Sequence, residues 1–247
     1  MKSLNEDLKT GQFKQIYLLY GEEAYLKKLY KNRFVKAMVP EGDTMNYRYF
    51  EGKNTNPKEI IDLAETLPFF AERRLIVLDT LCASVGQAML VREAARKQQE
   101  GLSIDELAAW VEENRLKICH WFTVDSFDHL KHGGRISAAA AAVGTMLQIK
   151  PLLHVDDEGK LRVAEKPRGR KQAIRTQIAH MKEGWTPDMG RLVVIGHGDC
   201  PEDAEQLRQA VLREFPDADI RTAYIGPIIG AHTGPGMLAL IYWGANR

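Results

Sequence analysis

Two polar residues near the end of the sequence, His232 and Thr233, stand between Gly230 and the turn Gly-Pro-Gly, with apolar runs on both sides. Glycine and proline fix the path of such a loop, so we expect the two side chains to be presented to a ligand. An imidazole beside a hydroxyl can bind a carboxylate or relay a proton. Segment 225–240 therefore predicts a binding site, with a structural histidine as the alternative.

A second group of candidate residues is basic. Arg135 follows the Gly133–Gly134 pair, where the backbone can approach a ligand closely, and its planar guanidinium suits a carboxylate or a phosphate. Arg168 and Arg170 lie in a basic cluster at the start of a predicted helix, a position where the helix dipole disfavours cations. This cluster indicates a surface that faces a partner or ligand. An internal ion pair for Arg135, and a merely solvated basic turn, are the alternatives.

The segment LPFFAERR places two aromatic residues, Phe69 and Phe70, directly after Pro68. Proline does not fit inside a helix, so it should direct both rings away from the helix end, with Leu67 nearby. Exposed rings on a rigid support can insert into a pocket of a partner protein. The alternative is that both rings fold back onto a sheet.

Composition excludes several classes of protein. The chain has 247 residues, 45% of them apolar and 27% charged, and a net charge of +1, so it gives no electrostatic reason for a dedicated nucleic-acid surface. Cys82, Cys119 and Cys200 are too far apart for a disulfide framework or a zinc site. No stretch is apolar enough to span a membrane, so we expect a cytoplasmic protein. We also expect neither a metal ion nor a cofactor.

The order of predicted elements changes near Asp79. Before it, apolar segments 15–21, 45–52 and 73–79 alternate with helical patterns, which is typical of a parallel α/β sheet. The first of these segments ends in a single glycine followed by two glutamates, which disfavours phosphate binding. After Asp79 we expect helices, strands and one hairpin. The predicted helices cover 84–101, 103–117, a short stretch from 126 that ends at the Gly133–Gly134 pair, 138–147, 168–183 and 201–215. The predicted strands are 117–125, 149–166 (the hairpin), 191–198, 219–226 and 237–246.

The first of these parts resembles a known family. QIYLLYGEEAYL, YFEGKN and LPFFAERRLIVL occur in the order found in the N-terminal part of the delta subunit of bacterial DNA polymerase III, a clamp-loader subunit. The resemblance covers residues 1–78. It implies an incomplete parallel three-stranded P-loop-like sheet without its phosphate loop, and binding to the sliding clamp and to other clamp-loader subunits. Leu67, Phe69 and Phe70 would then be the clamp-binding residues.

The second part resembles another family. The motifs DTLCASVGQAMLV, HGGRIS, IKPLLHV, KPRGRKQAI and HTGPG make residues 79–247 similar to the C-terminal domain of the DegV family. That resemblance implies a mixed-sheet α/β domain and a non-catalytic carrier for a long-chain fatty acid. It places His232, Thr233 and Arg135 at the lipid head group. It places Arg168 and Arg170 toward a fatty-acid kinase or the phosphate.

The two resemblances together predict a composite chain, with an incomplete clamp-loader-like fragment followed by a DegV-like α/β domain. Fatty-acid binding is the leading function, since more of the chain and more motifs support it. It is expected to be impaired, because the N-terminal domain of that family, which supplies hydroxyl groups and half of the tunnel, is missing. Clamp binding in DNA replication is the alternative.

Overall fold

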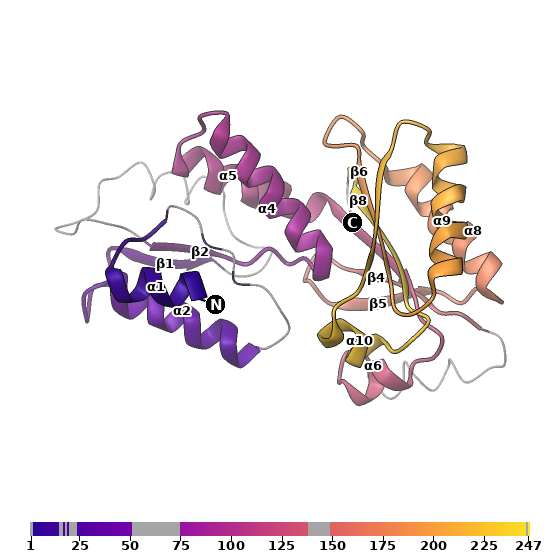
Figure 1. The fold of residues 1–247 in the computed structure, drawn as a ribbon, viewed down its shortest axis with the longest axis horizontal. Coiled ribbons are helices and arrows are strands. Elements are labelled where there is room, and N and C mark those ends of the chain that lie inside the picture. The colour runs from indigo at the N-terminus through magenta and orange to yellow at the C-terminus, as the bar shows by residue number, and fades with distance from the viewer. Residues whose placement is uncertain are drawn as a thin grey trace. The chain divides into compact units, whose positions relative to one another are not determined.

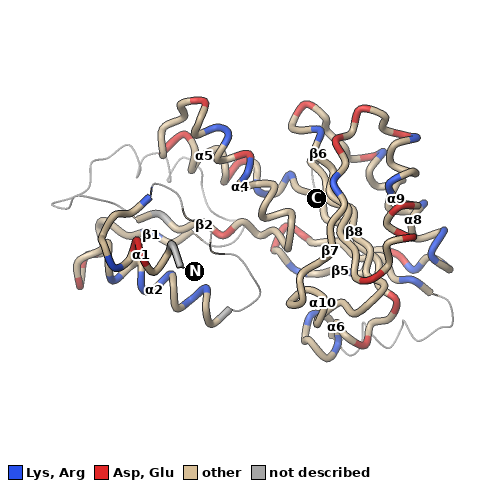
Figure 2. Tube along the Cα trace, viewed as in Figure 1, with Lys and Arg blue, Asp and Glu red and all other residues tan. Residues whose placement is uncertain are grey.

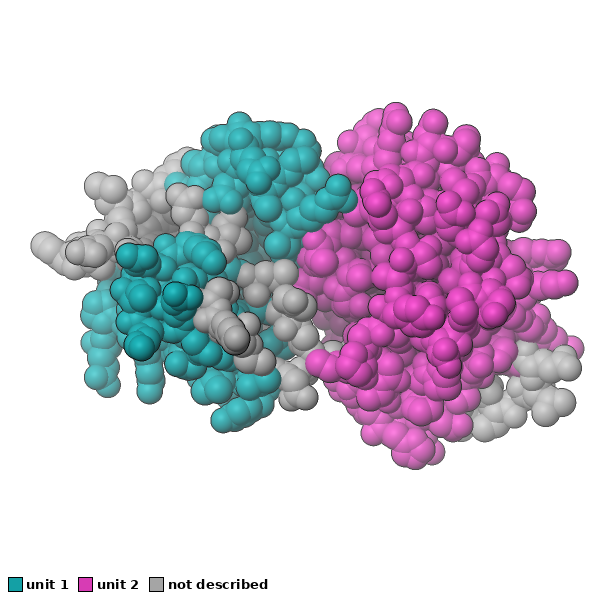
Figure 3. Space-filling view, in the orientation of Figure 1, with its two compact units in different colours: residues 1–80, 91–113 teal, residues 81–90, 114–247 magenta. Residues whose placement is uncertain are grey.

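The computed structural model describes residues 2–14, 17, 19, 24–50, 75–137, 149–245 and 247 (Figure 1). The chain divides into two compact units, which Figure 3 shows in different colours. Unit 1 comprises residues 1–80 and 91–113, and unit 2 comprises residues 81–90 and 114–247.

Unit 1 is built from helices and one small sheet. Its elements are α1 (Lys2–Thr10), α2 (Ala24–Met38), β1 (Tyr47–Phe50), β2 (Leu75–Leu78), the larger part of α4 (Ser84–Gln99) and α5 (Ile104–Asn114). Strands β1 and β2 pair in parallel, as the sequence predicts. The third predicted strand, 15–21, lies largely outside the described residues, so the three-stranded P-loop-like sheet stays a prediction.

The start of α5 follows from its sequence. The carboxylate of Glu106 accepts a hydrogen bond of 2.8 Å from the backbone N–H of Ser103, and the N–H of Glu106 donates to the Ser103 hydroxyl at 3.3 Å. These reciprocal bonds satisfy amide groups that have no partner within the helix. Ser103 and Glu106 thus form a capping box.

Unit 2 is a mixed α/β structure. Its strands are β3 (Ile118–Thr123), β4 (Leu152–Val155), β5 (Leu161–Glu165), β6 (Leu192–His197), β7 (Asp219–Tyr224) and β8 (Leu238–Trp243). Its helices are α6 (Asp128–His132), α8 (Arg170–Gly184), α9 (Pro201–Glu214), α10 (Pro227–Thr233), the first residues of α4, and the short 3-10 helix Arg115–Lys117. The six strands lie in the order β5-β4-β3-β8-β6-β7, and only β6 and β7 pair in parallel. This confirms the predicted mixed sheet.

The main core of unit 2 lies between the sheet and helices α8 and α9, which run side by side (Figure 1). Alternate residues of β8 point to the two faces of the sheet, and Leu238, Leu240 and Tyr242 face these helices. Ile178 of α8 and Leu207 of α9 meet them from the other side. The opposite face of β8, with Met237, Ala239 and Ile241, is left for other contacts.

Most charged residues of α8 are basic, whereas α9 carries charges of both signs and has acidic residues in its first turn (Figure 2). Two ion pairs join the helices, one between Lys182 Nζ and a carboxylate oxygen of Glu214 at 2.6 Å and one between Arg170 Nε and Asp203 at 2.9 Å. The basic side chains of α8 are thus partly balanced by the acidic ones of α9.

Candidate functional site

The Gly-Gly turn after α6 and the last turn of α10 bring two of the predicted site residues together. Arg135 Nη2 lies 3.4 Å from His232 Nε2, and Arg135 Nη1 donates to the backbone carbonyl of Gly133 at 3.0 Å. The imidazole of His232 packs directly on Gly133, since a Cβ at that position would overlap Nδ1 of the ring. The absence of a side chain at Gly133 is thus what allows the two elements to meet.

The chemistry of this pair suits an anion. An exposed guanidinium carries a fixed positive charge and a planar set of N–H donors, and an imidazole nitrogen can add a further hydrogen bond. Carboxylates and phosphates match this arrangement, because charge-assisted hydrogen bonds are the stronger ones. The two motifs that indicated a binding site are far apart in the sequence but adjacent in unit 2.

The neighbouring Thr233 is placed differently from the expected loop. Residues 227–233 form helix α10, in which Pro227 occupies the first turn, where a missing N–H costs nothing. The Thr233 hydroxyl donates to the backbone carbonyl of Ile229 at 2.9 Å, and the residue is buried. In this arrangement the hydroxyl proton is used within the helix. The prediction of a loop around the His–Thr pair is therefore wrong at residues 227–233, which form a helix. The apolar run IGPIIG resembles the end of a strand, so the sequence does not reveal this helix.

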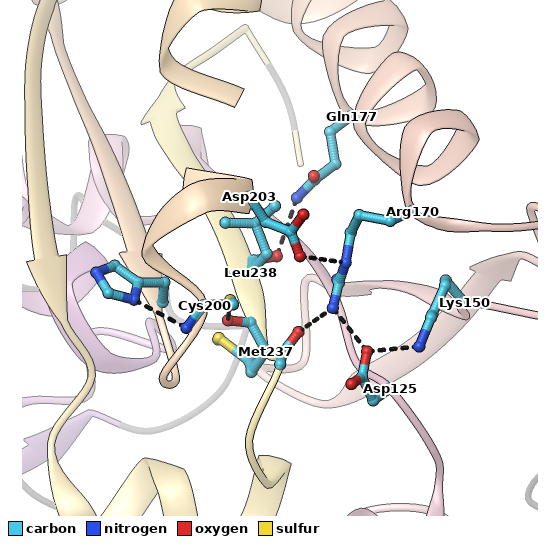
Figure 4. A network of polar contacts seen from close by, with 10 residues as sticks. Asp125, Lys150, Arg170, Gln177, Cys200, Asp203, Met237 and Leu238 are labelled. Carbon is cyan, nitrogen blue, oxygen red and sulfur yellow. Dashed lines mark hydrogen bonds and ion pairs between the residues drawn. The ribbon is translucent and has the colours of Figure 1, made fainter. Parts of the chain in front are cut away.

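The two arginines of the basic cluster have different surroundings, and Figure 4 shows those of Arg170. Arg168 is exposed at an isolated bridge with Ile149. The Arg170 side chain is only 14% exposed, and its Nη2 lies 2.6 Å from an Asp125 carboxylate oxygen while Nε lies 2.9 Å from Asp203. Nη2 also donates to the backbone carbonyl of Gly236 at 2.6 Å. Arg170 therefore joins α8 to α9 and to the loops after β3 and before β8.

Asp125 is the centre of this network, and sequence reasoning missed it. Lys150 Nζ also contacts Asp125 at 2.6 Å (Figure 4). Gly236 has a φ of 75°, and a Cβ there would overlap the Asp125 carboxylate. The second glycine of the turn GPG is therefore required for two reasons, namely its left-handed backbone conformation and the close approach of the Asp125 carboxylate.

A hollow opens on the face of the sheet opposite α8 and α9. The space within it is about 380 Å³, a volume that includes open solvent. Its lining residues are Ser84, Val85, Gly196, Ala223, Tyr224, Ile225, Gly226, Met237, Ala239 and Ile241. The lining is mainly apolar, so the hollow suits a hydrocarbon.

The floor of the hollow is a row of small residues in register. Gly196 of β6 pairs with Ala223 of β7 on one side and with Ala239 of β8 on the other. Sequence reasoning missed this row, because the register of β8 between β3 and β6 cannot be read from the separate strands. One end of the hollow adjoins α10, since Ile225 and Gly226 directly precede that helix.

Gly198 connects this end of the hollow with the end of α10. A Cβ at Gly198 would lie 3.1 Å from the side chain of Ile225 and 3.1 Å from the backbone carbonyl of Gly234, the residue after Thr233. The apolar hollow and the end of α10 that carries His232 are thus close neighbours in unit 2. Together they suit an amphiphile with an anionic head.

Two buried titratable groups of β3 are held in their neutral forms. Burial raises the pKa of the Cys119 thiol to about 11, and burial lowers the pKa of His120 to about 3. The Cys119 thiol is therefore not a nucleophile near neutral pH. Within the described ranges, no group of three or more metal-binding side chains occurs.

Leu67, Phe69 and Phe70 lie outside the described residues. In the part of the chain that the structure describes, no helix is both long and apolar enough to cross a membrane.

Comparison with protein families gives two overlapping matches. The model of the DegV family, described as an uncharacterised protein family, matches residues 59–244. The model of the delta subunit of DNA polymerase III matches residues 17–94. The DegV match covers most of the chain, and the delta-subunit match covers less than half of it.

Individual relatives agree with the larger match. A DegV domain-containing protein of Clostridium perfringens is 41% identical over 220 residues, which cover 87% of this chain and 76% of that protein. A crystal structure described as a fatty acid binding DegV family protein of Streptococcus agalactiae is 31% identical, with a TM-score of 0.60 over 67% of this chain and 59% of that one.

A further solved structure shows the same fold. The fatty acid kinase B3 protein of Streptococcus pneumoniae, loaded with linoleic acid, has a TM-score of 0.64 and 21% identity over 86% of this chain and 75% of that one. The matches to two other curated relatives, DegV domain-containing proteins of Lactococcus lactis and Streptococcus pneumoniae, span only 59% and 58% of the length of those proteins.

Proposed function

This chain belongs to the DegV family, and from that premise we propose that it binds one long-chain fatty acid in unit 2. The observation that carries the proposal is the juxtaposition of the Arg135–His232 pair with the apolar hollow. A cation and an imidazole beside an apolar space match a carboxylate attached to a hydrocarbon chain. The solved relative that is 31% identical is described as fatty acid binding.

In this proposal the carboxylate lies at the end of α10. His232 donates a hydrogen bond to it and Arg135 supplies the positive charge, from the two elements that meet at Gly133. Thr233 contributes its hydroxyl by turning it from the carbonyl of Ile229 to the ligand. The acyl chain lies in the hollow, over Gly196 and Ala239, where it is shielded from water.

The proposed role is that of a carrier and not of an enzyme, with the fatty acid as its ligand and no cofactor. The three cysteines have no disulfide pattern in the sequence and form no disulfide bond in the structure, which supports a cytoplasmic location. A fatty-acid kinase is the proposed partner. Of the two basic candidates, Arg168 is exposed and suited to contact it, whereas Arg170 is engaged with Asp125 and Asp203.

The test is a comparison of two histidine variants. His232→Ala should weaken binding of a fluorescent fatty acid about tenfold or more, because a hydrogen bond to a charged group contributes about 1.5–3 kcal/mol. His132→Ala is the matched control, since His132 is exposed at the end of α6 and should bind as the unaltered chain does. Equal affinity of both variants would remove His232 from the site. Failure of the unaltered chain to bind any fatty acid would refute the function itself.

A second function is favoured by the delta-subunit match at residues 17–94. We propose as an alternative that unit 1 binds a sliding clamp through Leu67, Phe69 and Phe70. Capture of the chain on immobilised clamp, and its loss in Phe69→Ala and Phe70→Ala, would support it. Failure of the unaltered chain to bind the clamp would exclude it.

The composite origin of the chain is also a proposal, with residues 1–78 related to the delta subunit and residues 79–247 to the DegV family. The order of motifs and the two family matches support it. Against it, the Clostridium perfringens match covers 87% of this chain and so extends into the segment before Asp79. A long DNA read across the codons for 74–84 tests it, since reads that always diverge there would show that the two parts belong to separate genes.

A further inference from the structure

The end of the hollow that lies away from α10 is closed by the start of α4. The N–H of Ala83 donates to Nε2 of His120 at 3.3 Å, and His120 is the register partner of Ile241 on β8. Ser84 and Val85, which follow Ala83, therefore line the hollow at its Ile241 end.

The other end of the hollow lies at Met237, beside α10. Met237, Ala239 and Ile241 point to the same face of β8 and all line the hollow. Because a strand rises about 3.3 Å per residue, Met237 and Ile241 are about 13 Å apart. An acyl chain whose carboxylate lies near His232 and that follows β8 thus runs toward Val85.

Contacts on the side of β3 fix the start of α4. His120 is 4% exposed, and its ring fills the space beside Gly86, where a Cβ would overlap Nε2. The neutral imidazole keeps this nitrogen as the acceptor for the N–H of Ala83. The first turn of α4 is therefore held against the sheet by both packing and a hydrogen bond.

A second set of contacts fixes the segment just before α4. Arg247 Nη1 donates to the backbone carbonyl of Leu81 at 2.7 Å, and Arg247 Nη2 lies 2.9 Å from Cys82 Sγ. Leu81 and Ser84 have φ values of 52° and 48°, which are uncommon for residues other than glycine. Such conformations persist where the surrounding contacts determine them, so this segment has little freedom to retreat.

From this geometry we propose that Val85 sets the length of the acyl chain that the hollow accepts. The inference rests on the proposed fatty-acid binding and adds a residue that determines specificity. An acyl chain that is too long meets the side chain of Val85, which lies in the first turn of α4. That turn is held in place by the contacts with His120 and Arg247 described above. A chain that is too short leaves part of the apolar lining without contacts, which also weakens binding.

The experiment compares chain-length preference in variants of the full chain. Delipidated protein is titrated with lauric, myristic, palmitic and stearic acids in a displacement assay with a fluorescent fatty acid. Val85→Ala should move the preference toward longer acids and Val85→Phe toward shorter ones. We expect the affinity ratio of stearic to myristic acid to change about tenfold in opposite directions, since one methylene in an apolar pocket alters selectivity by about 10- to 200-fold.

Val91→Phe is the matched control, because it introduces the same side chain on α4 at a residue that does not line the hollow. It should keep the original preference. If both Val85 variants also keep it, Val85 is not the end wall, while fatty-acid binding stands. If the unaltered chain binds none of the acids, the proposed function fails and the inference with it. Should Val85→Phe not fold, Val85→Ala alone decides, with folding checked by thermal unfolding.

Discussion

The substitution Gly133→Ala tests whether the position of His232 controls ligand binding. Gly133 ends α6 with a φ of −75°, a conformation that alanine adopts without strain. The added Cβ would nevertheless overlap Nδ1 of His232 and lie 3.0 Å from its Cε1. Because carbon atoms pack at about 3.5–4.0 Å, the imidazole has to leave its place beside Arg135.

The expected loss follows from the hydrogen bond that His232 gives to the carboxylate. A hydrogen bond to a charged group contributes about 1.5–3 kcal/mol, which corresponds to a loss of affinity of about ten- to a hundredfold. The protein should stay folded, since the substitution changes neither a buried ion pair nor a left-handed glycine. The loss should therefore appear in the dissociation constant and not as unfolding at the assay temperature.

The assay is displacement of a fluorescent fatty acid, with thermal unfolding measured on the same samples. Gly230→Ala is the matched control, because it lies in α10 with His232 but its Cβ would meet nothing within 4 Å. This control should bind as the unaltered chain does. Binding of Gly133→Ala with unaltered affinity would refute the reasoning that the ring position of His232 sets the affinity.

Two further predictions concern unit 2. Arg170→Met should lower the free energy of unfolding by about 1–3 kcal/mol, because two carboxylates and a carbonyl lose a partly buried partner. Arg168→Ala is the control and should change it by less than about 0.5 kcal/mol. Equal losses for the two variants in denaturant titrations would contradict this prediction. Burial lowers the pKa of His120 to about 3. Below pH ~6.5 the unfolded chain therefore binds more protons at this residue than the folded chain does. The contribution of His120 to the free energy of unfolding falls as the pH decreases toward 3. The contribution of His120 to the change in unfolding free energy with pH should reach about 1.4 kcal/mol per pH unit. This contribution should be absent in His120→Gln, as urea titrations of both proteins across this range would show.

Several elements of unit 2 could be predicted from sequence because their signals are local. The run ICHWFT, the turn around Asp157–Gly159 and the proline and acidic residues that open α9 each specify their own segment. The capping box of Ser103 and Glu106 is equally local. These segments were placed correctly because few long-range contacts compete with them.

The candidate site depended on contacts that sequence alone does not reveal. The basic cluster predicts that Arg170 faces a partner, yet its contacts are Asp125, 45 residues earlier in the chain, and the Gly236 carbonyl, 66 residues later. Helix α10 was missed because its seven residues carry two isoleucines and a glycine, a composition closer to a strand end. The row formed by Ala223, Gly196 and Ala239 exists only through the strand register, which depends on the tertiary fold.

Native mass spectrometry of the chain purified without detergent tests the central claim most directly. Fatty-acid binding predicts one species whose mass exceeds that of the bare chain by a single long-chain fatty acid, with this increment reduced in His232→Ala. A bare chain that also takes up no fatty acid when palmitic acid is added would contradict the account.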